Sequence, residues 1–228
     1  MRDAVNIQAV GFVAEGLQEL RERMVFVGGA VISLYADDPG ADLPRPTSDI
    51  DLVIELAGYA AYAHPEERLA ALGFRHSPED RITCRYRYHG VVVDIMPTDV
   101  PSVAPANPWY LPGLPHATEQ VLPNGIPIKL LPAPHFLGTK FAAFHGRGTD
   151  PRTSKDFEDI VYLLDGRLGL VDEVAHAPDD IRTFLAGEAR QLLEDPHIRE
   201  FLLGHLSPLV AVQRMELVLE KLRSLARN

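Results

Sequence analysis

The sequence is poor in the residues that cross-link a chain or anchor it in a membrane. A single cysteine, Cys84, among 228 residues excludes an internal disulfide framework and any zinc site built from several thiolates. No apolar run approaches the roughly 20 residues that a membrane span requires, and residues 1–4 do not open a signal peptide. We therefore expect a cytoplasmic protein that does not engage a membrane.

Positive charge is scarce as well. Lysine and arginine number 22 against 32 acidic residues, and the resulting net charge of −10 argues against general attraction to nucleic acid. The negative net charge does not exclude nucleic-acid binding. A cation-binding active site requires acidic residues, and a basic patch can be confined to one part of the surface. The nine histidines show no H-E-x-x-H spacing, and neither G-x-S-x-G nor a P-loop motif occurs, so serine-hydrolase and P-loop functions lose their main support.

The order of apolar segments and turn residues predicts an α+β protein in two parts. Residues 1–131 favour a mixed β-sheet with flanking helices, and residues 132–228 favour a helical C-terminal domain. Ten of the 19 prolines fall within residues 97–134 and exclude a mainly helical structure there. The expected strands cover residues 24–27, 49–56, 82–89, 91–96, 120–122 and 126–130, with Asn124-Gly125 as a hairpin turn. The expected helices cover residues 6–23, 30–35, 65–72 (opened by Pro65), 136–145, 154–164, 171–177, 181–193, 197–203 and 209–225.

Two glycines and three aspartates form the most informative pattern. Gly28-Gly29 follows an apolar strand and precedes a helical segment, so its backbone could receive a phosphate. Asp49 and Asp51 lie two positions apart in the next strand, and side chains at i and i+2 project from one face, roughly 6.6 Å apart. Asp94 lies within a third apolar strand. Three carboxylates on adjacent strands are what a two-metal phosphoryl-transfer site needs.

Each of these features also has a purely structural interpretation. The glycines could serve only the geometry of a tight turn, and aspartates are common at solvated strand ends. An unpaired Asp94 would be unfavourable to bury, so it needs either a metal or a cationic partner. A salt bridge to Arg85 or Arg87 across the predicted hairpin would satisfy that need without any function.

A second group of charged residues lies in the helical part. Lys140 and Arg147 are seven residues apart, which places them on one face of a helix. Lys140 could hold the phosphates of a nucleotide as a compact point charge, or it could be a surface lysine. Thr153 and Asp156 fit a capping box, whereas Asp159 lies in mid-helix and could pair with Lys140 or Arg147.

Taken together, these residues resemble the DNA polymerase β-type nucleotidyltransferase superfamily, and most of all its AbiEii/AbiGii toxin-type family. The resemblance rests on Gly28-Gly29 and on residues 45–52, 93–97, 140–147 and 155–163, in order and in rough separation. Residues 166–228 carry no motif that we can place. The chain departs from many relatives at Ala30, where a serine or threonine is usual, so the hydroxyl contact to the triphosphate is missing or moved to Ser33.

The resemblance implies transfer of a nucleoside monophosphate from an NTP to an acceptor hydroxyl, with release of pyrophosphate. Asp49 and Asp51 would hold two Mg²⁺ ions, with Mn²⁺ as the alternative, and Asp94 would bind the catalytic ion and accept the proton of the acceptor. The nucleotide would lie between the two parts. Its triphosphate would rest on Gly28, Gly29, Ser33 and Lys140, supported by Arg147 and oriented by Asp156 and Asp159 on the helical side.

The acceptor stays open at this stage. The resemblance favours RNA, plausibly tRNA ends, and Arg81, Arg85 and Arg87 on one hairpin strand could grip a phosphate backbone near Asp94. The alternatives are a small-molecule nucleotidyltransferase of the aminoglycoside type, which the net charge of −10 favours, and a catalytically idle binding protein of the same fold. The toxin-type relatives also imply an antitoxin protein as a partner.

Overall fold

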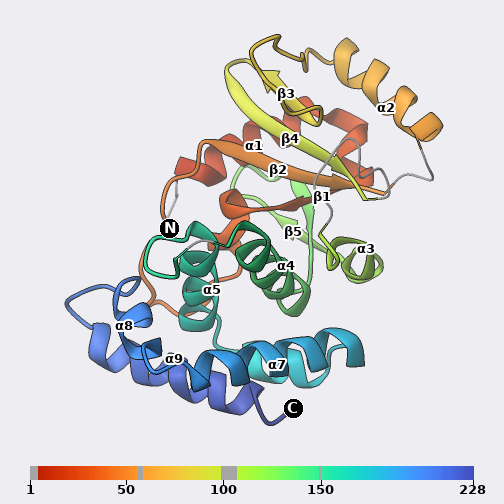
Figure 1. Cartoon of the computed structure of the whole chain (residues 1–228). Helices are drawn as coiled ribbons and strands as arrows, with labels where there is room; N and C mark the ends of the chain where they lie inside the picture. The colour runs from red at the N-terminus through yellow and green to blue at the C-terminus, as the bar shows by residue number, and fades with distance from the viewer. Residues whose placement is uncertain (1–4, 56–58, 99–106, 149) are drawn as a thin grey trace. The chain divides into compact units, whose positions relative to one another are not determined.

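The computed structural model describes residues 5–55, 59–98, 107–148 and 150–228 (Figure 1). The chain divides into two compact units. The first comprises residues 1–31 and 45–132, and the second comprises residues 32–44 and 133–228. The expected α+β class, a mixed sheet with flanking helices followed by a helical part, is confirmed. In the described ranges no helix is long and apolar enough to cross a membrane.

The first unit contains a six-stranded mixed sheet in the order β3-β4-β2-β1-β6-β5. Parallel pairs β2–β4 and β1–β6 alternate with antiparallel pairs β3–β4, β1–β2 and β5–β6. The central strand β1 is the most buried, since all four of its residues are shielded from solvent. The strands are β1 (Met24–Val27), β2 (Asp49–Ile54), β3 (Arg85–Tyr88), β4 (Val91–Pro97), β5 (Thr118–Val121) and β6 (Pro127–Leu130).

Both predicted hairpins are present, and glycine makes each turn. Gly125 between β5 and β6 has φ of 82°, and the Ile126 amide donates to the side chain of Asn124. Gly90 between β3 and β4 has φ of 88°, and His89 before it also has positive φ. His89-Gly90 is a two-residue turn with both φ values positive, which matches the twist of an antiparallel pair. The turn between β5 and β6 is longer and has its positive φ at Gly125.

In the first unit, two phenylalanines from outside the sheet pack on the face of β3 that carries its tyrosines. The helices are α1 (Val5–Gly16), α2 (Tyr59–Ala71) and α3 (Tyr110–Gly113), with short 3₁₀ segments η1 (Gln18–Arg23) and η3 (Leu114–His116). Phe12 of α1 packs on Tyr88 at 5.2 Å between ring centroids, and Phe74 after α2 stacks on it at 4.3 Å. Because side chains alternate along a strand, Arg85 and Arg87 project from the opposite face.

Two predicted helices of this unit differ from the observed ones. The helix expected over residues 6–23 ends at Gly16, because Gln18 takes φ of 49° and the chain continues as η1. The helix expected to open at Pro65 begins at Tyr59 instead and runs through the proline. The alanines that precede Pro65 favour helix strongly enough to extend it N-terminally, although the proline removes one hydrogen bond. β2 ends at Ile54, and residue 56 lies outside the described residues.

The second unit contains six helices within its described residues. They are α4 (Ala133–Arg147), α5 (Lys155–Gly166), α6 (Leu170–Ala175), α7 (Asp179–Glu194), α8 (Ile198–Leu203) and α9 (Ala211–Leu225). Each of the six was expected, with ends that differ by a few residues. The cap of α5 was not, since the Ser154 side chain accepts from the Phe157 amide and takes the place predicted for Thr153.

Residues 32–44 belong to the helical unit although the flanking segments belong to the sheet unit. The amides of Asp37 and Asp38 both donate to the carbonyl of Gly166 at 3.0 Å. Arg214 of α9 pairs with Asp38 and with Asp165 of α5, at 2.6 Å each. These contacts fix the segment against the C-terminal end of α5. The 3₁₀ helix η2 (Gly29–Leu34), expected as an ordinary helix over residues 30–35, leads into it.

Candidate active site

The three predicted carboxylates lie on one face of the sheet. β2 and β4 pair in parallel with Asp51 opposite Asp94, so these two side chains project from the same side. Asp49 lies two residues before Asp51 and shares that side. This is the face opposite to the one packed by Phe12 and Phe74. The arrangement that the i, i+2 spacing predicted is therefore present in the first unit.

The glycine turn meets this face directly. Val27 at the end of β1 pairs with Asp51, and Gly28 follows with φ of 73°. A Cβ atom built on Gly28 would lie 1.9 Å from Oδ2 of Asp51. Residue 28 must therefore be glycine for two reasons, its backbone conformation and the space that the Asp51 carboxylate occupies. The sequence indicated a glycine turn at this place but did not predict its contact with Asp51.

Asn6 positions the segment that leads into the aspartate strand. Its side-chain amide donates to the Arg45 carbonyl at 3.0 Å and its oxygen accepts from the Thr47 amide at 3.1 Å. The Thr47 hydroxyl then donates to Oδ1 of Asp49 at 2.9 Å. Asn6 is 4% exposed, so these bonds replace the water that a buried amide loses. The entry into β2 and the orientation of Asp49 thus depend on α1.

Arg85 neutralises part of the carboxylate cluster. It lies opposite Asp94 in the β3–β4 pair, and its Nε and Nη2 donate to Oδ1 and Oδ2 of Asp94 at 2.8 and 2.7 Å. The same Nη2 lies 3.8 Å from Oδ2 of Asp49. The Asp94 hydrogen bonds raise the pKa of the Arg85 guanidinium further above its ordinary value. The salt-bridge alternative for Asp94 is therefore present, with Arg85 as the partner.

The donor set of this cluster suits a hard divalent cation. Carboxylate oxygens are the ligands that Mg²⁺ and Mn²⁺ prefer, and the Arg85 guanidinium between Asp94 and Asp49 shows that positive charge is accommodated there. Within the part of the chain that the structure describes, no three His, Cys, Asp or Glu side chains lie close enough together to hold a metal ion as placed. The chemistry of these ligands suits a divalent cation, but in this arrangement Arg85 holds both oxygens of Asp94.

Cys84 lies beside this cluster and is fully buried. Burial raises the pKa of its thiol to about 11, and the nearby Asp94 carboxylate adds to the effect. The thiol therefore stays protonated at neutral pH and is a poor nucleophile.

The charged residues predicted on the helical side pair with one another between α4 and α5. Lys140 lies 2.7 Å from Asp159, with side chains 8% and 3% exposed, and Arg147 pairs with Asp156. Lys140 also lies over the Phe136 ring at 5.1 Å. The structure thus brings these four predicted residues together within the second unit, as two ion pairs that join the helices.

Gly29 and Ser33 are the remaining predicted contacts. Gly29 begins η2 in the first unit, and Ser33 falls in the segment that belongs to the second unit. The Ser33 hydroxyl is shielded from solvent and has no hydrogen-bond partner among the described residues. Its predicted contact to the triphosphate stays a prediction.

A comparison with protein families decides the classification. The family model described as "Nucleotidyl transferase AbiEii toxin, Type IV TA system" matches residues 12–227. The chain belongs to this family. The resemblance that the motifs indicated is confirmed, and the match extends through residues 166–227, where we placed no motif.

Two further comparisons add little to the family match. The crystal structure of an antigenic nucleotidyltransferase-like protein from Paracoccidioides brasiliensis is similar to this AbiEii-family chain at 20% identity and a TM-score of 0.49. The alignment covers 91% of this chain and 96% of that one. No curated protein matches the chain.

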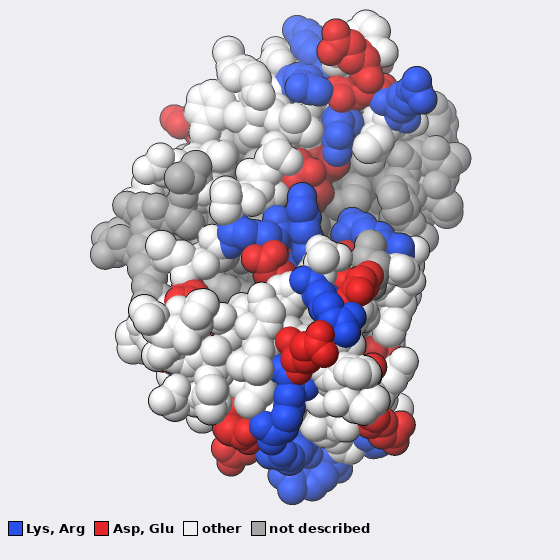
Figure 2. Space-filling model, turned by 60° about the vertical axis from the view of Figure 1, so that its left-hand side comes forward, with Lys and Arg blue, Asp and Glu red and all other residues white. Residues whose placement is uncertain are grey.

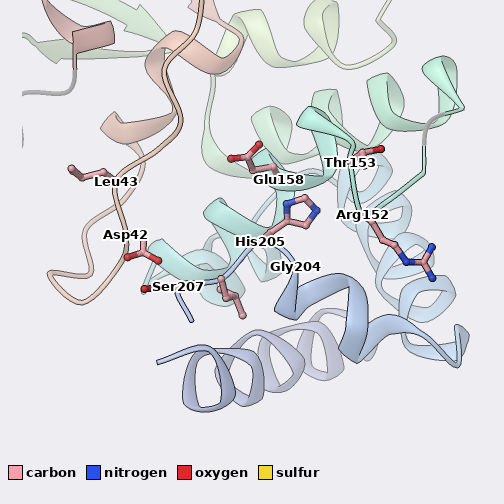
Figure 3. Close-up of a pocket in the computed structure, with 9 residues that line it drawn as sticks. Asp42, Leu43, Arg152, Thr153, Glu158, Gly204, His205 and Ser207 are labelled. Carbon is pink, nitrogen blue, oxygen red and sulfur yellow. The ribbon is translucent and has the colours of Figure 1, made fainter. Parts of the chain in front are cut away.

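This AbiEii-family chain also has a pocket of about 690 Å³ within the second unit (Figure 3). The residues predicted for the site do not line it. Its wall combines two carboxylates, one arginine and two leucines, which is a mixed chemistry without a dominant charge. The lining residues are Asp42, Leu43, Arg152, Thr153, Glu158, Gly204, His205, Leu206 and Ser207.

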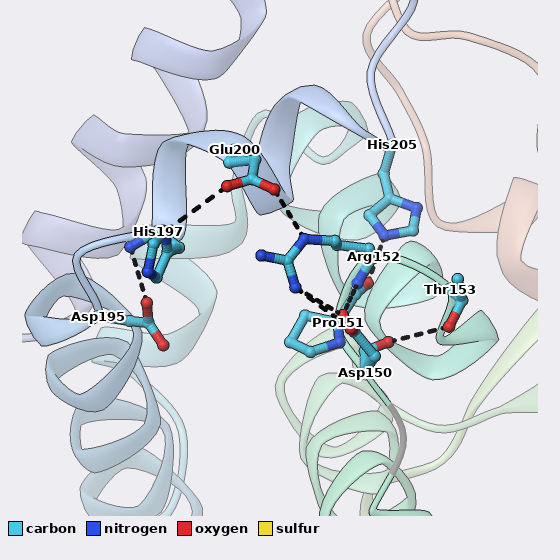
Figure 4. Close-up of polar contacts among 8 residues, drawn as sticks. All are labelled: Asp150, Pro151, Arg152, Thr153, Asp195, His197, Glu200 and His205. Carbon is cyan, nitrogen blue, oxygen red and sulfur yellow. Dashed lines mark hydrogen bonds and ion pairs between the residues drawn. The ribbon is translucent and has the colours of Figure 1, made fainter.

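The polar groups beside this pocket are largely engaged with each other (Figure 4). Arg152 donates to Glu200 at 2.7 Å and to Asp150 at 3.2 Å, and it lies over the Phe201 ring. Nε2 of His205 lies 2.7 Å from the Pro151 carbonyl. These contacts fix the residues before α5 against α8, so we assign them a structural role.

The arginines predicted to grip RNA are engaged as well. Arg85 holds Asp94, and Arg87 makes two hydrogen bonds of 2.9 Å to Asp80. Arg81 is exposed. On the face shown in Figure 2, basic side chains lie next to acidic ones. The hairpin arginines therefore do not present the uncompensated basic strip that the sequence suggested.

Proposed function

We propose that this chain transfers a nucleoside monophosphate from an NTP to an acceptor hydroxyl, with release of pyrophosphate. The single observation that carries the proposal is the placement of Asp49, Asp51 and Asp94 on one sheet face, with Asp51 packed against the Gly28 turn. Membership of a nucleotidyltransferase family supports the same reaction class.

Asp49, Asp51 and Asp94 would hold Mg²⁺, or Mn²⁺ in its place. When bound, the cation would neutralise charge on the phosphates and on the attacking and leaving oxygens. The acceptor oxygen forms a bond to the α-phosphorus while the bond to the pyrophosphate oxygen breaks, and Asp94 takes the acceptor's proton. Thr47 and Asn6 fix the orientation of Asp49 before the reaction begins.

The backbone at Gly28 and Gly29 would receive the triphosphate, because neither residue has a side chain of its own to block it. Lys140 and Ser33 would add contacts to the triphosphate with Arg147 in support, and Asp159 and Asp156 would orient Lys140 and Arg147. The ion pairs of α4 and α5 support the orienting part of this proposal. Because Lys140 and Asp159 are both buried and paired, the Lys140 ammonium would contact a phosphate while it keeps its bond to Asp159.

We propose RNA, and tRNA in particular, as the acceptor, with an antitoxin protein as the cellular partner. The support is the toxin family to which the chain belongs. A small cationic acceptor is the second candidate, favoured by the net charge of −10 and by the engagement of Arg85 and Arg87 with carboxylates.

The test is to incubate the full chain with each α-³²P-labelled NTP, Mg²⁺, and either total RNA or an aminoglycoside. RNA labelling that disappears with Asp94→Asn but persists with Asp80→Asn supports the proposal, since among the described residues the Asp80 side chain pairs with Arg87 and not with the aspartate cluster. Label on the aminoglycoside alone would replace RNA by the second candidate. No label with any NTP and either acceptor would refute nucleotidyl transfer for this chain.

A further inference from the structure

Arg85 is the one basic side chain that the described contacts place against the carboxylate cluster. It contacts both oxygens of Asp94, at 2.8 and 2.7 Å, and approaches Asp49 at 3.8 Å. Its side chain is only 23% exposed, and that of Asp94 only 12%. Partial burial reduces competition from water, so this bidentate pair is a strong one.

The neighbouring arginine shows that this placement is specific to one position. Arg87 shares the strand and the face of Arg85 but makes its bidentate contact with Asp80. Register explains the difference, because β3 places Arg85 opposite Asp94 and Arg87 opposite Val92. The sequence alone left the two arginines equivalent as partners of Asp94.

A guanidinium and a divalent cation would require the same oxygens. Three carboxylates on one face repel one another, and a buried carboxylate such as that of Asp94 is unfavourable without a cationic partner. Arg85 supplies that compensation from within the chain. A metal ion that draws on Asp94 must therefore take over at least one of the oxygens that Arg85 holds.

We infer that Arg85 is a positioning residue that competes with the divalent cation for Asp94. It keeps the carboxylate cluster neutralised and ordered before the metal binds, and it releases an Asp94 oxygen when the metal enters. This inference rests on the proposed function, because it takes the aspartate cluster to be the metal site. Without nucleotide, the protein should therefore bind a divalent cation more weakly than the same three carboxylates would bind it in the absence of Arg85.

Mn²⁺ binding to the full chain without nucleotide tests the inference, with free Mn²⁺ measured by its electron paramagnetic resonance signal. Arg85→Ala should lower the Mn²⁺ dissociation constant by roughly tenfold or more, which is the effect of losing one competing charge-assisted contact. Arg85→Lys, which keeps the charge but not the fork, should give a smaller gain and covers the case in which the alanine variant does not fold. Arg87→Ala is the matched control and should leave Mn²⁺ binding unchanged.

Thermal unfolding gives an independent readout. In EDTA the Arg85→Ala variant should melt below the wild type, because the carboxylates then repel without compensation, and Mn²⁺ should raise its melting temperature by more than it raises that of the wild type. The added variant Arg85→Ala/Asp94→Asn should lose the gain in affinity. That loss would assign the effect to Asp94.

The outcomes separate this inference from the proposed function. Equal Mn²⁺ affinity in wild type and Arg85→Ala, with binding in both abolished by Asp94→Asn, would overturn the competition while leaving the metal site in place. Weaker binding in Arg85→Ala would overturn it too, and would make Arg85 a support for the ligand. If neither the wild type nor any of the variants binds Mn²⁺, both the competition and the aspartate metal site are refuted.

Discussion

The buried pair between Lys140 and Asp159 gives the sharpest test of the second unit. The two charges lie 2.7 Å apart with side chains 8% and 3% exposed. At an effective dielectric constant of ~20, two unit charges at this distance attract by about 6 kcal/mol, and desolvation of both groups offsets much of that. Removing only the lysine leaves the desolvation of Asp159 without its compensation. We therefore expect Lys140→Ala to lower the free energy of unfolding by about 3–5 kcal/mol.

Urea unfolding followed by far-UV circular dichroism measures this loss, because the helices of the second unit contribute most of the signal. Trp109, the only tryptophan, lies in the first unit and reports that unit separately by fluorescence. Lys155→Ala on α5 is the matched control. Lys155 is exposed, so its loss should change the stability by no more than about 0.5 kcal/mol.

The double variant Lys140→Met/Asp159→Leu separates pairing from packing. With both charges replaced by apolar side chains of similar volume, stability should return close to that of the wild type or exceed it. A loss below about 1 kcal/mol in Lys140→Ala, with no coupling in the double-mutant cycle, would refute the buried pair. Lys140 would then be available for a nucleotide, and its alanine variant could be used in ligand-dependent melting without correction for stability.

Two further predictions follow from the glycine turn and from the segment over residues 32–44. Gly28→Ala should abolish Mn²⁺ binding and nucleotide transfer, and it should lower the melting temperature more than Gly90→Ala does. Both glycines have positive φ, but of the two only residue 28 faces a carboxylate, which lies 1.9 Å from the position of a Cβ atom. Equal effects of the two substitutions in both assays would show that backbone strain alone matters. Asp38 has its pKa lowered, first by the Gly40 amide and then by Arg214, so its stabilisation is present above about pH 4 and lost as the pH falls through the lowered pKa. The stability gap between wild type and Asp38→Asn should therefore narrow between about pH 5 and 3 in urea titrations, and a constant gap would contradict the ion pair.

Local patterns were sufficient for the sheet unit. The turn residues Asn124-Gly125 and Gly90 predicted both hairpins, since each turn requires a positive φ that glycine adopts readily. The i, i+2 spacing of Asp49 and Asp51 placed them on one face without any knowledge of the fold. Their distance from Asp94 followed only from the strand order, which pairs β2 with β4 across 43 positions of sequence.

The sequence did not predict which residues far apart in the chain form pairs. Asp94 had two candidate arginines, and Asp159 had two candidate partners in Lys140 and Arg147. Strand register and helix packing chose between them. Asn6 gave no signal at all, because a buried asparagine in an apolar helix is interpreted only when its partners at Arg45 and Thr47 are known.

The path of residues 32–44 has a consequence for how the protein can be divided. The chain passes between the two units at three places, after residues 31, 44 and 132, so no single cut yields two intact units. A fragment that ends near residue 131 would keep residues 32–44 but lose Gly166 and Arg214, which hold Asp37 and Asp38. The glycine turn and the first aspartate flank that inserted segment on either side. Because residues 32–44 belong to the helical unit, that unit can be exchanged for another only by replacing the insertion as well.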